Sequence, residues 1–149
     1  MKQYIGTKTI QAAPMTRDEA EAMWGRSIGG ERTGDGYLVT YPDGYESWSP
    51  KDVFEAAYRV NGQLTFADAM YCLSEGYEVY RTGWNGKGMT VFKPSGDVVL
   101  SNANSGDSRL VGIKPAYLML GTDQQLAIWA PSQSDMTATD WCFVEDSEG

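Results

Sequence analysis

A glycine-rich stretch, Arg81–Met89 (RTGWNGKGM), constrains the fold of this chain more than any other. The residues on either side, 77–81 and 89–93, alternate or cluster apolar side chains as strands do, which predicts a hairpin with Trp84 at its tip. The glycines of the turn permit positive φ and let a partner approach the backbone closely. The turn therefore suits recognition of a nucleobase or a ribose. The alternative is an ordinary Asn-Gly turn with Trp84 folded into the core.

Other short segments repeat the alternation of strand and turn. Segments 37–41 and 45–48 flank the turn Pro42-Asp43-Gly44, and segments 116–120 and 125–129 flank a turn at 121–123. An earlier segment, 4–12, also has strand-like composition. Strands of this length joined by tight turns predict an α+β fold, in which small antiparallel sheets carry short helices packed on them.

Capping residues mark where the helices of this fold begin. Thr16 and Glu19 form a capping-box pattern ahead of a helix that runs to about Trp24, where Gly25 follows. Ser49 as N-cap and Pro50 at the first helical position predict a helix through Tyr58. Thr65 caps a third helix, which Gly76 ends. The apolar face of this third helix comprises Phe66, Ala69, Met70 and Leu73.

Two polar stretches and one turn divide the chain. Residues 29–36 form a loop by composition, and the eight small polar residues 101–108 predict a second exposed, mobile loop, with 98–100 extending the sheet before it. The turn Asn61-Gly62 ends the first part. We therefore expect an N-terminal α+β extension over 1–62 and a second domain over 63–149.

The charge of the chain limits its partners. Twelve basic and 20 acidic side chains give a net charge of −8, which argues against binding a nucleic-acid polymer or an anionic membrane. A small phosphate-bearing ligand stays open, because a few local cations and amides suffice for it. No apolar run approaches the roughly 20 residues of a membrane span, and the first residues lack an apolar signal core. These features predict a cytoplasmic protein.

Histidine and cysteine usage removes several enzyme classes. The sequence has no histidine, so Ser-His and Cys-His nucleophiles and the common zinc hydrolase sites are impossible. Cys72 and Cys142 lack the CxxC spacing of a metal or redox site, which predicts two buried free thiols. We expect no metal and no cofactor.

Three runs of the C-terminal part carry a family resemblance. They are Thr65–Ala69, Gly83–Met89 and Trp129–Met136, and Thr139-Asp140-Trp141 follows them in the same order and spacing. Together they resemble the second Thoeris anti-defence family of phage proteins, over roughly the last 85 residues. The run 44–54 resembles an extension that precedes this domain in phage proteins, and no activity follows from it. The preceding 60 residues and the segment 101–108 exceed the minimal form of the family.

The resemblance implies a function without catalysis. The members of that family are sponges that hold cyclic nucleotide signals. They bind glycocyclic ADP-ribose, and some of them also bind cyclic dinucleotides such as cyclic di-GMP at a separate site. It also implies a homotetramer with ligand pockets between subunits. The expected ligand-binding residues lie in two of the runs and are Trp84, Asn85, Lys87, Ser132, Gln133, Asp135 and Met136.

Residue chemistry suggests a role for each group of these side chains. Trp84 is expected to stack on a base, with Asn85 and Lys87 bonding to ribose or phosphate oxygens. Ser132 and Asp135 have the spacing of a helix start, whose free amides attract phosphates, and Asp135 should accept from a ribose hydroxyl or a base amine. Gln133 is expected to complete the polar wall of the ligand pocket, and Met136 to add an apolar contact there. The alternative is that Ser132 and Asp135 only cap their own turn.

Two other classes of function stay open. A carboxylate-dependent phosphodiesterase would use Asp135 and Asp140 as its pair, although nothing in the sequence raises the pKa of either carboxyl group. A structural or protein-interaction component of a phage would instead use the tyrosines and tryptophans as contact residues. A sponge predicts stoichiometric capture and intact release, an enzyme predicts a product, and an interaction protein predicts neither.

Overall fold

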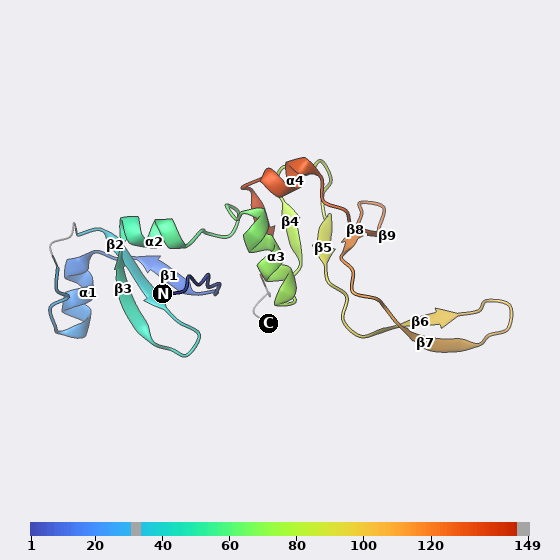
Figure 1. Cartoon of the computed structure of the whole chain (residues 1–149), viewed down its shortest axis with the longest axis horizontal. Helices are drawn as coiled ribbons and strands as arrows, with labels where there is room; N and C mark the ends of the chain where they lie inside the picture. The colour runs from blue at the N-terminus through green and yellow to red at the C-terminus, as the bar shows by residue number, and fades with distance from the viewer. Residues whose placement is uncertain (31–33, 146–149) are drawn as a thin grey trace. The chain divides into compact units, whose positions relative to one another are not determined.

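The computed structural model describes residues 1–30 and 34–145, and it divides the chain into two compact units, Met1–Arg59 and Val60–Gly149. Figure 1 shows the elements of both units. Small antiparallel sheets and four short helices make up the described residues, which confirms the predicted α+β class. The sequence-based boundary at 62 falls a few residues after the division between the units. Part of the predicted loop at 29–36, residues 31–33, lies outside the described residues.

The N-terminal unit is a three-stranded sheet with two helices. Its elements are β1 (Gln11–Pro14), α1 (Arg17–Trp24), β2 (Gly36–Thr40), β3 (Glu46–Pro50) and α2 (Lys51–Ala57), with β2 as the central strand. Thr16 and Glu19 form the predicted capping box, and Gly25 ends α1 in the left-handed region. Gly36 is required in β2, because a Cβ there would collide with the Ser49 carbonyl and the Trp48 ring.

Two predictions for this unit were wrong in their bounds. The strand expected over 4–12 begins only at Gln11, because β2 ends at its partner Thr40 and the chain then turns away. Ser49 is not the cap of α2. It pairs with Tyr37 in the β2–β3 ladder, so the N-cap position falls on Pro50, which has no side chain able to cap.

The C-terminal unit is built on a five-stranded antiparallel sheet in the order β10-β4-β5-β8-β9. The strands are β4 (Val79–Arg81), β5 (Thr90–Phe92), β8 (Leu118–Leu120), β9 (Leu126–Ile128) and β10 (Trp141–Phe143), and the helices are α3 (Phe66–Ser74) and α4 (Gln133–Thr137). The two predicted hairpins, β4–β5 and β8–β9, are both present. Thr65 and Asp68 form a capping box at the start of α3, and Gly76 follows the helix with φ of 94°.

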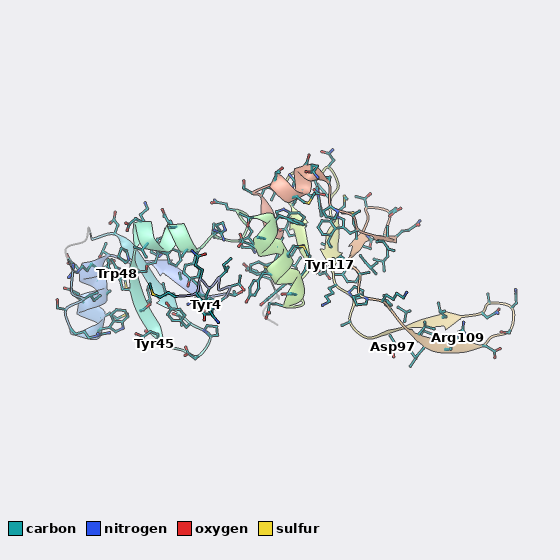
Figure 2. The ribbon with its side chains drawn as sticks, in the orientation of Figure 1. Tyr4, Tyr45, Trp48, Asp97, Arg109 and Tyr117 are labelled. Carbon is teal, nitrogen blue, oxygen red and sulfur yellow. The ribbon has the colours of Figure 1, made fainter. Side chains whose placement is uncertain are left out.

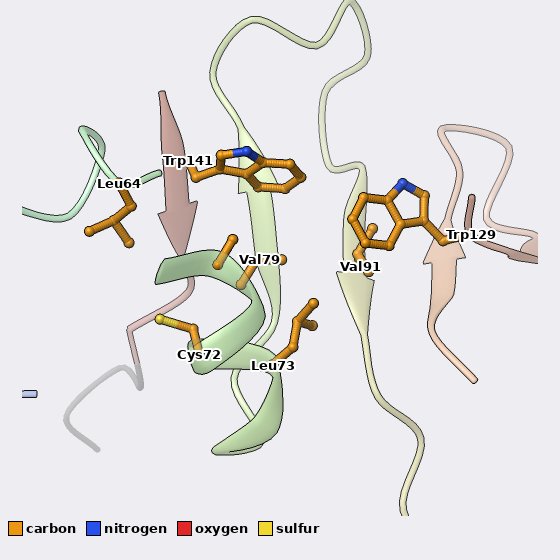
Figure 3. Close-up of a cluster of buried hydrophobic side chains, with 8 residues drawn as sticks. Leu64, Cys72, Leu73, Val79, Val91, Trp129 and Trp141 are labelled. Carbon is orange, nitrogen blue, oxygen red and sulfur yellow. The ribbon is translucent and has the colours of Figure 1, made fainter. Parts of the chain in front are cut away.

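One hydrophobic core lies between α3 and this sheet (Figure 3). Leu73, Val79, Val91 and Trp141 have no exposed surface, and Trp129 is 8% exposed. The Trp129 and Trp141 rings meet edge to face with centroids 5.9 Å apart. Cys72 and Cys142 are buried free thiols, as predicted. None of the helices in the described ranges is long and apolar enough to cross a membrane.

The segment predicted as a loop at 101–108 is the end of a two-stranded ribbon. β6 (Asp97–Ser101) pairs with β7 (Ser108–Gly112), and Ser101 faces Ser108, so only 102–107 form the turn. The Asn102 side chain organises that turn by accepting hydrogen bonds from the amides of Asn104 and Ser105. The expectation that 98–100 extend the main sheet was therefore wrong, because their partner strand is the adjacent β7.

The two edges of the five-stranded sheet differ. Along β10, Leu64 pairs with Trp141 through backbone hydrogen bonds of 3.1 and 3.2 Å. The side-chain amide of Asn61 binds the next residue but one along this edge. Its Oδ1 accepts from the Phe143 N–H at 2.9 Å, and its Nδ2 donates to the Phe143 carbonyl at 3.0 Å. Segment 61–64 thus covers this edge. The opposite edge is β9, where Leu126 and Ile128 are exposed.

Candidate functional site

Arg81 joins the glycine-rich turn to the C-terminal signature. It is the last residue of β4, and its side chain is 16% exposed. Its Nη1 donates to Asp135 Oδ1 at 2.9 Å, and its Nε donates to Asp140 Oδ1 at 2.8 Å. One guanidinium therefore fixes two carboxylates from distant parts of the chain, a task that suits its planar set of donors.

Asp135 is the most enclosed member of this network, with 7% of its surface exposed. Besides Arg81, its Oδ1 accepts from the Trp84 indole N–H at 3.0 Å, and its Oδ2 accepts from the Ser132 amide at 3.0 Å. Burial acts to raise the pKa of Asp135, but the donors from Trp84, Ser132 and Arg81 outweigh burial and hold that pKa below its usual value. The carboxylate is charged at neutral pH.

Asp140 holds the first residues of the turn. Its Oδ2 accepts from the Gly83 amide at 2.7 Å and from the Thr82 hydroxyl at 3.3 Å. The Arg81 guanidinium is the main cause of its lowered pKa. A Cβ at residue 83 would lie 2.7 Å from the Asp140 carboxylate, so glycine is needed there to let the turn approach.

Trp84 lies at the tip of the β4–β5 hairpin, as predicted, and is half-buried. Its ring packs on the core, edge to face with Trp141 at 5.4 Å between centroids, and its N–H points to Asp135. These contacts match part of the alternative interpretation, in which the tryptophan is a core residue.

The other predicted site residues lie at or near the surface. Asn85 and Lys87 in the turn are exposed, as are Ser132, Gln133 and Met136 at α4. No hydrogen bond or ion pair within 1–30 and 34–145 engages Lys87. Hydrogen bonds bring Trp84, Ser132 and Asp135 together directly. The other four predicted residues, Asn85, Lys87, Gln133 and Met136, flank these three along the chain.

The start of α4 is a capping box. Asp135 donates its amide to Ser132 Oγ at 3.1 Å, and the Ser132 amide is bound by the Asp135 carboxylate. The backbone amides of Ser132 and Asp135, which were expected to be free for a ligand, therefore already have acceptors within the turn. This agrees with the alternative in which the two residues cap their own turn. The predicted short turn is present as α4. The indole Nε1–H of Trp141 donates a hydrogen bond to the Asp135 carbonyl at 2.9 Å.

Arg81 is the residue that sequence reasoning missed. It was assigned to the turn without a role, because its partners lie 54 and 59 residues away along the chain. The available signal was the pair of aspartates in the C-terminal signature, which need a cation if both are to be enclosed.

The arrangement is poorly suited to acid–base chemistry. A carboxylate pair that cleaves phosphodiesters or glycosides needs one carboxyl group with a raised pKa to donate a proton. Here the pKa of Asp135 and that of Asp140 are both lowered, and both groups bind the same guanidinium. The described part of the chain holds no group of three or more His, Cys, Asp or Glu side chains able to bind a metal.

Comparison with known proteins assigns the C-terminal unit to a family. The sequence profile of the Thoeris anti-defense 2-like domain matches residues 64–144. The chain is also similar to Thoeris anti-defense 2 of Bacillus phage SP01, with 34% identity over 86 residues that cover 55% of this chain and 96% of the relative. The match supports a role against Thoeris defence. A non-catalytic mode of action fits such a role. The chain belongs to the Thoeris anti-defense 2-like family, and it carries that domain behind an N-terminal unit of its own.

Proposed function

We propose that this protein captures cyclic nucleotide immune signals and holds them without cleaving them. Family membership supports the role, and the Arg81 network is the observation that carries the mode of action. The network fixes the glycine-rich turn against α4 before any ligand arrives. Rigid presentation lowers the entropic cost of binding, which is what a tight sponge requires.

The turn and α4 supply the contacts. Trp84 stacks on a base with its exposed part, and Asn85 and Lys87 bond to ribose or phosphate oxygens. Lys87 suits the anionic groups because no internal partner among the described residues neutralises it. Ser132 and Gln133 extend the polar wall, and Met136, which is 38% exposed, offers apolar contact.

Asp135 has a narrower role. Its Oδ1 receives hydrogen bonds from Arg81 and Trp84, and its Oδ2 receives one from the Ser132 amide, while the Ser132 hydroxyl also lowers the pKa of this carboxyl group. A carboxylate can only accept hydrogen bonds, so toward a ligand Asp135 suits a ribose hydroxyl or a base amine and repels a phosphate.

The ligands proposed are glycocyclic ADP-ribose and cyclic dinucleotides such as cyclic di-GMP. Capture at signalling concentrations requires a dissociation constant of roughly 1 nM, or about −12 kcal/mol. Stacking and charge-assisted contacts in an enclosed pocket reach this value. No metal or cofactor takes part in the proposal, and its place of action is the cytoplasm of the infected cell.

Capture and intact release form the central prediction. After incubation with each nucleotide, chromatography of the free fraction is expected to show stoichiometric depletion of the ligand. Heating the complex should then return the same nucleotide unchanged, because neither carboxylate is set to donate a proton. A hydrolysed product would contradict the proposal in favour of an enzyme. Absence of both depletion and product would favour a protein-interaction role.

The assembly proposed is a homotetramer with pockets between subunits. A domain of this size encloses a dinucleotide-sized ligand more fully between copies than on one face. Light scattering at micromolar concentration is expected to give about four times the chain mass of 16.4 kDa. The mass of a single chain with binding retained would refute this assembly.

A further inference from the structure

An open hollow lies at the turn that joins β2 to β3 in the N-terminal unit. Tyr41, Pro42, Asp43 and Tyr45 line it, and its volume is about 470 Å³. The two tyrosine rings stack with centroids 5.8 Å apart, and Tyr45 is 63% exposed. Exposed tyrosines beside a hollow are typical of surfaces that bind other proteins.

The backbone of this turn fixes the shape of the hollow. The Tyr41 amide donates to the Tyr45 carbonyl at 2.8 Å, and the Tyr45 amide donates to Asp43 Oδ1 at 3.0 Å. Gly44 supports the turn with φ of 84°, a value that side chains rarely allow. The two rings are therefore in place before a partner arrives, which lowers the entropic cost of binding.

A cation already occupies the hollow. The Nζ atom of Lys8 lies over the Tyr41 ring, 4.4 Å from its centroid. The face of an aromatic ring attracts an ammonium group, and the Asp43 carboxylate in the lining adds a charge of opposite sign. The contact identifies a lysine side chain as a group that this hollow accepts.

Lys8 belongs to a segment with little else to hold it. No hydrogen bond within the described ranges involves residues 1–9. Tyr4 and Ile5 in this segment are 88% and 99% exposed, and Figure 2 shows the segment beside the β2–β3 hairpin, with Tyr4 and Tyr45 labelled. Lys8 can therefore leave the hollow at the cost of one exposed cation–π contact.

The charge around the hollow indicates which partner can replace Lys8. Residues 11–59 contain five basic and nine acidic side chains, so their net charge is 5 − 9 = −4. This charge repels nucleic acids and anionic membranes and attracts a basic polypeptide.

We propose that the hollow docks a lysine-bearing segment of another polypeptide, and that Lys8 occupies it until that segment binds. The docking uses only the N-terminal unit and is independent of nucleotide capture. It gives a role to the unit that precedes the family domain.

The test uses a synthetic peptide with the sequence of residues 1–9, added to the full chain that carries Lys8→Ala. Amide shifts of Gly44 and Tyr45, followed by NMR, report binding at the hollow. Saturable shifts are expected with this peptide. The control peptide has norleucine in place of Lys8, which keeps the aliphatic stem without the charge, and it should not bind.

Variants of the chain assign the contact to the hollow. The parent chain should need roughly threefold to sixfold more peptide than Lys8→Ala, because its own lysine competes. In the Lys8→Ala background, Tyr41→Leu should raise the dissociation constant roughly twofold to fivefold. Asp43→Asn keeps an acceptor for the Tyr45 amide but removes the charge, and should also weaken binding. Tyr4→Leu removes an exposed tyrosine outside the hollow and should leave binding unchanged.

Three results would overturn the docking site. They are equal binding of the norleucine peptide, absence of any shift with the lysine peptide, and binding that neither Tyr41→Leu nor Asp43→Asn weakens. Displacement of the peptide by an equal concentration of tetramethylammonium would instead assign the hollow to small cations. Asp43→Asn decides the matter if Tyr41→Leu fails to fold.

Discussion

Replacing Arg81 with alanine is expected to lower the free energy of unfolding of the C-terminal unit by about 3 kcal/mol, since the enclosed carboxylates lose their common partner. Asp135 would remain almost buried with its negative charge uncompensated, and Asp140 would lose its ion pair. For a unit of this size, the melting temperature should fall by roughly 12–24 °C in differential scanning calorimetry. Arg81→Lys should lie between the parent and alanine, because an ammonium retains the charge without the planar donors that reach both carboxylates.

Acid titration identifies the cause of that loss. Because the pKa of Asp135 and that of Asp140 are lowered in the folded chain, their ionised forms stabilise it above the unfolded aspartate value of about 3.9. This stabilisation is lost as the pH falls through the folded values. The difference between parent and Arg81→Ala should therefore shrink in acid. A difference that stays constant down to about pH 2 would contradict the ion-pair explanation.

Replacing Trp84 with alanine is expected to weaken nucleotide capture by roughly 5- to 150-fold, because stacking on one base contributes about 1–3 kcal/mol. Calorimetric titration with glycocyclic ADP-ribose and with cyclic di-GMP measures the change. Trp84 also packs on Trp141 and donates to Asp135, so the same substitution removes contacts of the fold. Loss of stability and loss of binding must therefore be measured separately.

Three further variants separate these roles. Trp84→Phe keeps an aromatic face without the indole N–H, so it should lose stability and retain most of its binding. Asn85→Ala and Lys87→Ala alter exposed side chains and should weaken capture without lowering the melting temperature. Asp135→Ala is expected to impair both properties. If all of these variants bind every ligand as tightly as the parent, the proposed pocket is wrong.

Local signals in the sequence predicted the hairpins and the starts of α1, α3 and α4. The capping boxes at Thr16, Thr65 and Ser132 each need partners only three residues away, so their pattern is visible in a short window. The turn before Tyr45 was predictable for the same reason, since Asp43 bonds to its amide two residues on. Interactions over a few residues depend little on the rest of the fold.

Features that depend on distant partners were missed or misplaced. The polar composition around 101–108 concealed the pairing of Ser101 with Ser108, and the strand-like segment 4–10 pairs with no strand among the described residues. The candidate site follows the same rule. Its residues in each run could be named from the sequence, but the Arg81 network that joins the runs could not, because composition does not specify which carboxylates a given cation will meet.

The coverage of β10 by segment 61–64 limits how the five-stranded sheet can grow. An open sheet with two free edges can add strands at both ends, and repeated addition produces a fibre. Here the Asn61 amide and the Leu64 backbone occupy the hydrogen-bonding groups of one edge, so only β9 can accept another strand. Two sheets that met through β9 would leave no free edge between them, and their growth would stop at a pair.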